Sequence, residues 1–222
     1  MTTDSIVEKV IQYVALVLAL CVHEFAHAAT ARALGDSTAE DQGRLSLNPL
    51  VHADPFGTVL IPLMGMFMGF GLFGWARPVP VQPGNFKQGW YAKGQIWTAA
   101  AGPLSNIAQA LAWALVLFAA ARIAPNLLFD PDGPGRFFLV FAYFSVLINL
   151  ILAAFNLIPL PPLDGGHVAS WALRRDLAEK YDKFVQPPTG FILLLLLFPA
   201  MGFLLRPVIL VGQALLGLAL GA

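Results

Sequence analysis

The sequence has few charged residues and almost no cysteine. Only 13 of its 222 residues are Lys or Arg and 13 are Asp or Glu, whereas 58% are hydrophobic. Long uncharged runs of this kind are typical of polytopic membrane proteins and exclude an ordinary soluble globule. The net charge is zero and the basic residues form no stripe, so the composition indicates no nucleic-acid partner.

The single cysteine, Cys21, excludes an internal disulfide. It lies in the first apolar segment, shortly before two histidines, His23 and His27. An α-helix turns by about 100° per residue, so Cys21 points roughly 120–160° away from both of them. We therefore expect a small apolar residue here rather than a metal ligand.

Three long apolar segments predict membrane-spanning helices, at about 6–31, 94–121 and 137–158. Each is long enough to cross about 30 Å of hydrocarbon at a rise of about 1.5 Å per residue. A fourth apolar stretch, 189–222, has an Arg-Pro pair in its middle, which favours two short helices in a hairpin over one kinked span. Residues 167–186 are amphipathic and charged, which predicts a helix on the membrane surface.

A shorter apolar segment, 55–75, is interrupted by Pro62 and by glycines at 65, 69, 71 and 74. Such breaks are tolerated at membrane depth where a segment is re-entrant or packed inside protein. The alternating prolines of 77–83 forbid a central strand and predict an edge strand or an extended loop. No internal repeat or linker divides the chain, so we expect a single membrane-embedded domain, 1–222.

The motif His23-Glu24-Phe25-Ala26-His27 lies near the end of the first segment. Two histidines four residues apart share one helix face and can bind one metal ion. Glu24 lies beside that face, where it can take a proton from the attacking water, as in metalloproteases. Each charge inside a membrane is disfavoured by roughly 2.5–3.5 kcal/mol, so ionisable residues in this setting indicate function.

A third metal ligand must come from elsewhere in the chain, because catalytic zinc usually takes three protein ligands and leaves one position open. The candidates are His52, Asp54, Asp164 and His167. Asp164 is favoured because it follows a Pro- and Gly-broken segment at the end of a spanning helix, where its carboxylate has no other evident partner. With a divalent metal, Asp164 and Glu24 would give a site of zero net charge.

This choice fixes the topology. Asp164 can reach the histidines only if segments 6–31 and 137–158 run parallel, so 55–75 must return to the side it entered from. One side of the membrane then carries nine basic residues against four, and the positive-inside rule makes that side, with the opening of the site, cytoplasmic. In a prokaryote the membrane is the cell membrane. The nine are Arg32, Arg44, Arg77, Lys87, Lys93, Arg174, Arg175, Lys180 and Lys183; the four are Lys9, Arg122, Arg136 and Arg206.

The sequence resembles the site-2 proteases, intramembrane zinc metalloproteases that cleave transmembrane helices of other proteins. The resemblance rests on 23–27, on Gly102 to Asn106, and on 156–166, which ends in Leu163-Asp164-Gly165-Gly166. It implies an all-α polytopic protein with a three-helix catalytic core, a re-entrant, partly extended segment and C-terminal helices. Residues 45–58 are similar to those of compact prokaryotic members, and the chain has no room for a PDZ-like or nucleotide-sensing domain.

The resemblance further implies that His23, His27 and Asp164 bind one zinc per chain and that Glu24 is catalytic. The expected partners are a transmembrane protein substrate and the lipid bilayer. An amide from Asn106 or Asn156 is a candidate contact for the developing oxyanion or the substrate, with a hydrogen bond between helices as the alternative.

Two other functions use the same residues. A metal-ion carrier has no need of Glu24 beside an open coordination position, and a non-catalytic membrane-protein-binding scaffold needs neither Glu24 nor Asp164. An enzyme is therefore favoured. A substrate helix must unwind before hydrolysis, and the extended stretch 77–83 is expected to pair with the unwound strand, with a stiff connector as the alternative.

Overall fold

The computed structural model describes residues 3–68, 73–130 and 133–221. Within these ranges the chain forms helices joined by loops, with no β-strand. Four helical stretches are long and apolar enough to cross a membrane: 6–33, 91–123, 135–156 and 189–220. The expectation of an all-α polytopic membrane protein is thus confirmed.

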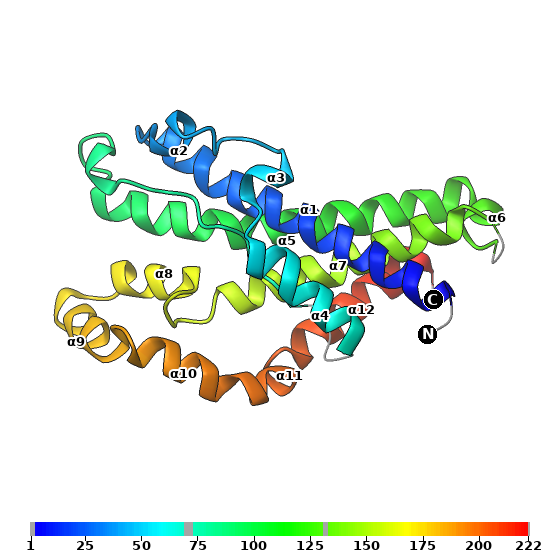
Figure 1. Ribbon diagram of the computed structural model, residues 1–222. Helices are drawn as coiled ribbons and strands as arrows, with labels where there is room; N and C mark the ends of the chain where they lie inside the picture. Colours follow the sequence, from blue (N-terminus) through cyan, green and yellow to red (C-terminus); the bar gives the residue numbers. More distant parts are fainter. Residues whose placement is uncertain (1–2, 69–72, 131–132, 222) are drawn as a thin grey trace.

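The core consists of three helices, α1 (Thr3–Ala33), α5 (Tyr91–Ile123) and α7 (Gly135–Asn156). They lie side by side along the molecule, and each packs against the other two (Figure 1). Small residues allow the helices to approach closely, as where Ala114 of α5 and Ala142 of α7 lie in one buried cluster with the larger Leu117 and Val146.

Helices α1 and α7 run parallel, as the position of Asp164 required. At one end Arg136 donates a hydrogen bond to Glu8, with 3.5 Å between Nη2 and Oε1. At the other end His23 and His27 lie beside Asp164, just beyond the end of α7. The core therefore brings the end of the first helix next to the end of the third.

The segment 55–75 does return to its starting point. It begins with a π-helical turn, η1 (Pro55–Leu60), and continues as α4 (Ile61–Met68). The returning chain donates from the Trp75 N–H to the Gly57 carbonyl at 3.1 Å. A Cβ at Gly57 would lie 2.4 Å from the Trp75 ring, so the close approach requires glycine. Gly69 and Gly71, which we expected to break this segment, lie outside the described residues.

After this hairpin, residues 73–82 are extended and belong to no strand, which makes the Pro-rich stretch an extended loop rather than an edge strand. The remaining short elements before α7 lie in the connections between the core helices. They are α2 (Thr38–Asp41), α3 (Pro49–His52), η2 (Pro83–Asn85) and α6 (Pro125–Leu128).

The amphipathic region after the core is two helices rather than the one that we expected over 167–186. Helix α8 (Asp164–Ala172) and helix α9 (Arg175–Val185) are separated by Leu173 and Arg174. Both of these residues have extended backbones, with ψ angles of 151° and 147°, and this ends the first helix.

The C-terminal stretch is one kinked span, so the prediction of a hairpin was wrong. It consists of α10 (Thr189–Leu197), η3 (Phe198–Ala200), α11 (Met201–Leu204) and α12 (Arg206–Leu220). Helix α10 packs on α9, whereas α12 ends beside α5, where Arg122 donates to the Ala219 carbonyl at 3.1 Å. A proline is the second residue of both η3 and α12, in the first turn, where a missing N–H is tolerated, so the prolines bend the span without reversing it.

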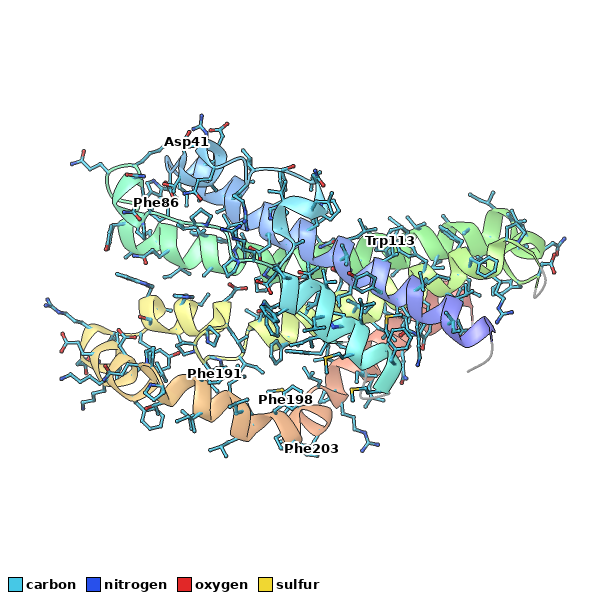
Figure 2. The ribbon with its side chains drawn as sticks, viewed as in Figure 1. Asp41, Phe86, Trp113, Phe191, Phe198 and Phe203 are labelled. Carbon is cyan, nitrogen blue, oxygen red and sulfur yellow. The ribbon has the colours of Figure 1, made fainter. Side chains whose placement is uncertain are left out.

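This span covers the outside of the molecule. Phe191, Phe198 and Phe203 lie at successive points along this span in Figure 2, and each is more than half exposed. In a bilayer such side chains contact lipid, as the apolar composition of the span requires.

Candidate metal centre

His23 and His27 project from the same face of α1, one turn apart, as their spacing predicts. Both are buried, and their Nε2 atoms lie 3.0 Å from each other. The Nδ1 atom of His27 lies 2.6 Å from the carbonyl oxygen of Thr98. A carbonyl can only accept, so in the neutral ring Nδ1 donates and Nε2 presents its lone pair to the site.

Helix α5 passes close to the two rings at Gly102. A Cβ added there would lie 2.4 Å from His27 Nε2 and 2.5 Å from His23 Nε2. Glycine therefore leaves open the space that the two nitrogens face. This explains why the sequence has glycine at position 102, inside a long helix.

Asp164 reaches the histidines from the first turn of α8. Its Oδ2 lies 3.2 Å from His23 Nε2, and its Oδ1 lies 3.4 Å from His27 Nε2. The two glycines that follow let α8 begin against the broken end of α7. A Cβ at Gly165 would lie 2.4 Å from the Leu157 carbonyl oxygen, and one at Gly166 would lie 2.6 Å from the Pro161 nitrogen.

These three side chains fit a zinc ion. Among the described residues they form the one group of His, Cys, Asp or Glu side chains whose ligand atoms all lie within 4.8 Å of one another. Ligands about 2.0 Å from zinc in a tetrahedron lie about 3.3 Å apart, close to the separations of 3.0, 3.2 and 3.4 Å here. Asp164 Oδ2 is buried without a hydrogen-bond donor, as expected of an atom that binds a cation.

Glu24 follows His23 on α1 and is buried. Its Oε2 accepts a hydrogen bond from the Val79 N–H at 3.0 Å. Its other oxygen, Oε1, has no hydrogen bond within the part of the chain that the structure describes. One oxygen of this carboxylate is thus held by the backbone, and the other remains available for a proton.

The extended stretch beside Glu24 is fastened to the rest of the protein. Arg44 donates from Nη2 to the carbonyls of Arg77 at 2.5 Å and Pro78 at 3.3 Å, and the Arg77 N–H donates to the His52 carbonyl at 2.8 Å. We expected these backbone groups to be free for a substrate strand. Instead the protein uses them to position the Val79 N–H, because a buried backbone group without a partner is unfavourable.

Asp36 fastens the far end of this stretch. Its carboxylate accepts from the Gln82 N–H at 2.7 Å and from Asn85 Nδ2 at 3.0 Å. Burial disfavours the charged form, but hydrogen bonds from Thr38, Gln82 and Asn85 outweigh this and lower the pKa of Asp36 below its usual value. The carboxylate is therefore charged at neutral pH and holds the loop against the end of α1.

The other candidate ligands lie outside the metal group. His52 is buried, with Nε2 2.7 Å from the Ser46 carbonyl oxygen. Asp54 caps η1 by accepting from the N–H groups of Phe56 and Gly57 at 3.0 and 2.6 Å. His167 is exposed, one turn after Asp164.

The two asparagines that we singled out occupy different positions. Asn106 is fully buried, with Oδ1 2.6 Å from His23 Nδ1, and its Nδ2 donates to Asn149 Oδ1 at 2.8 Å. Asn156 is half-buried and donates to the Leu152 carbonyl at 3.0 Å. Asn149 was missed by the sequence analysis, although an amide in the middle of an apolar spanning segment is a signal that could have identified it.

Similarity to known proteins agrees with this geometry. A model described as Peptidase family M50 matches residues 135–197. The chain is 37% identical over 204 residues to "Putative zinc metalloprotease YwhC" of Bacillus subtilis. The aligned residues make up 90% of this chain and 86% of the relative. The chain belongs to peptidase family M50. "Putative zinc metalloprotease Rip2" of Mycobacterium tuberculosis is 31% identical over 191 residues, 83% of this chain and 65% of the relative. No solved structure matches the chain significantly.

Membership of the M50 family confirms the resemblance that the motifs indicated. Together with the four spanning helices, it makes the protein an intramembrane zinc metalloprotease. The alternatives of a metal-ion carrier and a non-catalytic scaffold do not account for this membership. A protease within the membrane acts on membrane proteins and works in contact with lipid.

Proposed function

We propose that His23, His27 and Asp164 bind the zinc and that Glu24 is the catalytic acid and base for hydrolysis of a peptide bond in or near a transmembrane segment. One observation supports this assignment best. The Nε2 atoms of His23 and His27 and the carboxylate oxygens of Asp164 lie 3.0–3.4 Å from one another, and Glu24 lies beside the two histidines on α1.

The chemistry then divides between the zinc and the protein. When bound, zinc supplies Lewis-acid activation of the water and of the scissile carbonyl. Glu24 takes the proton of the attacking water at Oε1, because its Oε2 is engaged by the Val79 N–H. The same carboxyl group then returns the proton to the leaving amine, which completes the hydrolysis.

Of the two asparagines, Asn156 is the better candidate for contact with the developing oxyanion or the substrate. It lies in the broken end of α7, a few residues before Asp164, and is partly accessible. Asn106 is completely buried, and its amide is occupied by His23 and Asn149.

The zinc content of purified variants tests the ligand assignment. We expect about one zinc per chain in the native protein and less than about one tenth of that in His23→Ala, His27→Ala and Asp164→Ala, because each removes one of three ligands. His52→Ala is the matched control, since His52 is a buried histidine that bonds the Ser46 carbonyl instead. A normal zinc content in Asp164→Ala, together with a loss of zinc in His52→Ala, would show that Asp164 is not the third ligand.

We also propose that the site opens toward the cytoplasm and that the membrane is the cell membrane in a prokaryote. The nine basic residues at the end of the core that carries the site support this orientation. Cysteine labelling in a Cys21→Ala background measures it. We expect Glu40→Cys, Gln88→Cys and Lys180→Cys to react with an impermeant reagent only in opened cells.

The control for this labelling is Asn126→Cys, which lies in the short helix α6 beyond the opposite end of the core. It should react in intact cells. Labelling of Glu40→Cys and Gln88→Cys from opposite sides would contradict the return of 55–75, and labelling of all three in intact cells would reverse the orientation.

A further inference from the structure

A chain of buried amides leads from the backbone of α7 to the metal centre. It begins at the Ser145 carbonyl, which accepts from Asn149 Nδ2 at 2.8 Å. Asn149 Oδ1 accepts from Asn106 Nδ2 at 2.8 Å, and Asn106 Oδ1 lies 2.6 Å from His23 Nδ1. Ser145, Asn149 and Asn106 are each at most 2% exposed, so water does not compete for these groups.

This chain has a direction, which follows from its starting point. A backbone carbonyl can only accept, so Asn149 must turn its NH₂ toward Ser145 and its oxygen toward Asn106. Asn106 must then turn its own NH₂ toward Asn149 and its oxygen toward His23. That oxygen can only accept, so His23 carries its proton on Nδ1 and presents a lone pair on Nε2.

The lone pair of His23 Nε2 points into the site, toward His27 Nε2 at 3.0 Å and Asp164 Oδ2 at 3.2 Å. The opposite tautomer would place a proton there, and that proton would have to leave before a metal could bind. His27 needs no such chain, because the Thr98 carbonyl holds its Nδ1 directly. Only the tautomer of His23 therefore depends on side chains of other helices.

We propose that Asn149 is a positioning residue for the metal centre, which acts through Asn106 to fix the tautomer of His23. Asn149 is on α7, and its hydrogen bonds go to Asn106 and Ser145 rather than to the proposed ligands or Glu24. The inference rests on the proposed role of His23 as a zinc ligand. It assigns a function to a residue that lies two hydrogen bonds away from the site.

The first test is the affinity of Asn149→Leu for zinc, measured with a competing chelator on the purified full chain. Leucine is similar in size to asparagine but makes no hydrogen bond to Asn106. The Asn106 amide can then rotate by 180° and exchange the positions of its oxygen and nitrogen. Loss of an outer partner of a metal-binding histidine typically lowers affinity by about 10–100-fold, and we expect a loss of that order. The control is Gln109→Leu, the same kind of amide-to-leucine change one turn beyond Asn106 along α5, which removes a buried amide nitrogen without a hydrogen-bond partner and should leave the affinity unchanged.

A conservative variant separates positioning from packing. In Asn149→Asp the buried carboxyl group is favoured in its neutral form. It can then donate an O–H to the Ser145 carbonyl and accept from Asn106, as asparagine does. We expect near-native zinc affinity in Asn149→Asp. A loss as large as that in Asn149→Leu would indicate a role in packing and overturn the proposal.

The tautomer itself can be observed without metal. Nitrogen-15 spectra of histidine-labelled, zinc-free protein distinguish the two tautomers, and His23→Ala identifies the signal among only four histidines. We expect His23 to be protonated on Nδ1 in the native chain and in Asn149→Asp. In Asn149→Leu we expect a mixture of the Nδ1-protonated and Nε2-protonated tautomers. Native affinity and an unchanged tautomer in Asn149→Leu would overturn the proposal. If His23→Ala itself kept its zinc, the ligand assignment would be wrong instead, and the two failures are thus distinguishable.

Discussion

Glu24→Gln is expected to slow peptide-bond hydrolysis by roughly 10²–10⁴-fold while the zinc content stays the same. Glutamine has the shape of glutamate, and its amide oxygen can still accept from the Val79 N–H at the position of Oε2. It cannot take a proton from water at neutral pH, so the attacking water is no longer activated by a base. The measurement is cleavage of tagged single-pass membrane proteins co-expressed with the native chain or the variant.

The same substitution at an exposed acid, Glu40→Gln, is the control for this experiment. Glu40 lies in α2, where it pairs with Arg32 on the surface, and its loss should leave hydrolysis unchanged. Cleavage by Glu24→Gln at the native rate would remove Glu24 from the mechanism. Loss of zinc together with activity would give it a structural role in place of a catalytic one.

Gly102→Ala is expected to abolish zinc binding, although the change adds only one methyl group. The new Cβ would lie 2.4–2.5 Å from the Nε2 atoms of both histidines, in the space that a metal must share. Both rings are buried and held at Nδ1, so they cannot move aside without breaking a hydrogen bond. Zinc content and cleavage should therefore fall together.

The fold should survive this change, which separates it from general destabilisation. Alanine is a better helix former than glycine by about 1 kcal/mol, which offsets part of the roughly 1–3 kcal/mol that such overpacking costs, so the thermal unfolding temperature should fall by only a few degrees. Gly202→Ala is the matched control, because a Cβ there meets no atom within 4 Å. Normal zinc in Gly102→Ala would mean that the histidines bind their metal from another side.

The sequence was sufficient to predict that His23, His27 and Asp164 come together, that α1 and α7 run parallel, and that 55–75 returns to its starting side. A charged side chain in an apolar segment needs a partner, and the few such residues left Asp164 as the favoured partner for His23 and His27. That single pairing required parallel α1 and α7, and hence the return of 55–75. Each step used the cost of burying charge, which depends little on detailed packing.

Other features depend on packing between helices and could not be predicted in this way. The Val79 N–H bond to Glu24 exists because Arg44 and His52 hold the extended loop, and no local pattern relates these residues. The C-terminal span was mispredicted because an Arg-Pro pair is compatible with a hairpin and with a bend. The contact of α12 with α5 decides between them.

The placement of the proposed ligands at positions 23, 27 and 164 has a consequence for biogenesis. Synthesis proceeds from the N-terminus, so both histidines enter the membrane long before Asp164, and the amides of Asn106 and Asn149 also arrive in between. Until the third core helix has been inserted, the nascent chain has the proposed base, Glu24, but only two of the three proposed metal ligands. We therefore expect the protease to be inactive while it is being made, so that proteins inserted beside it are not cleaved before its own fold is complete.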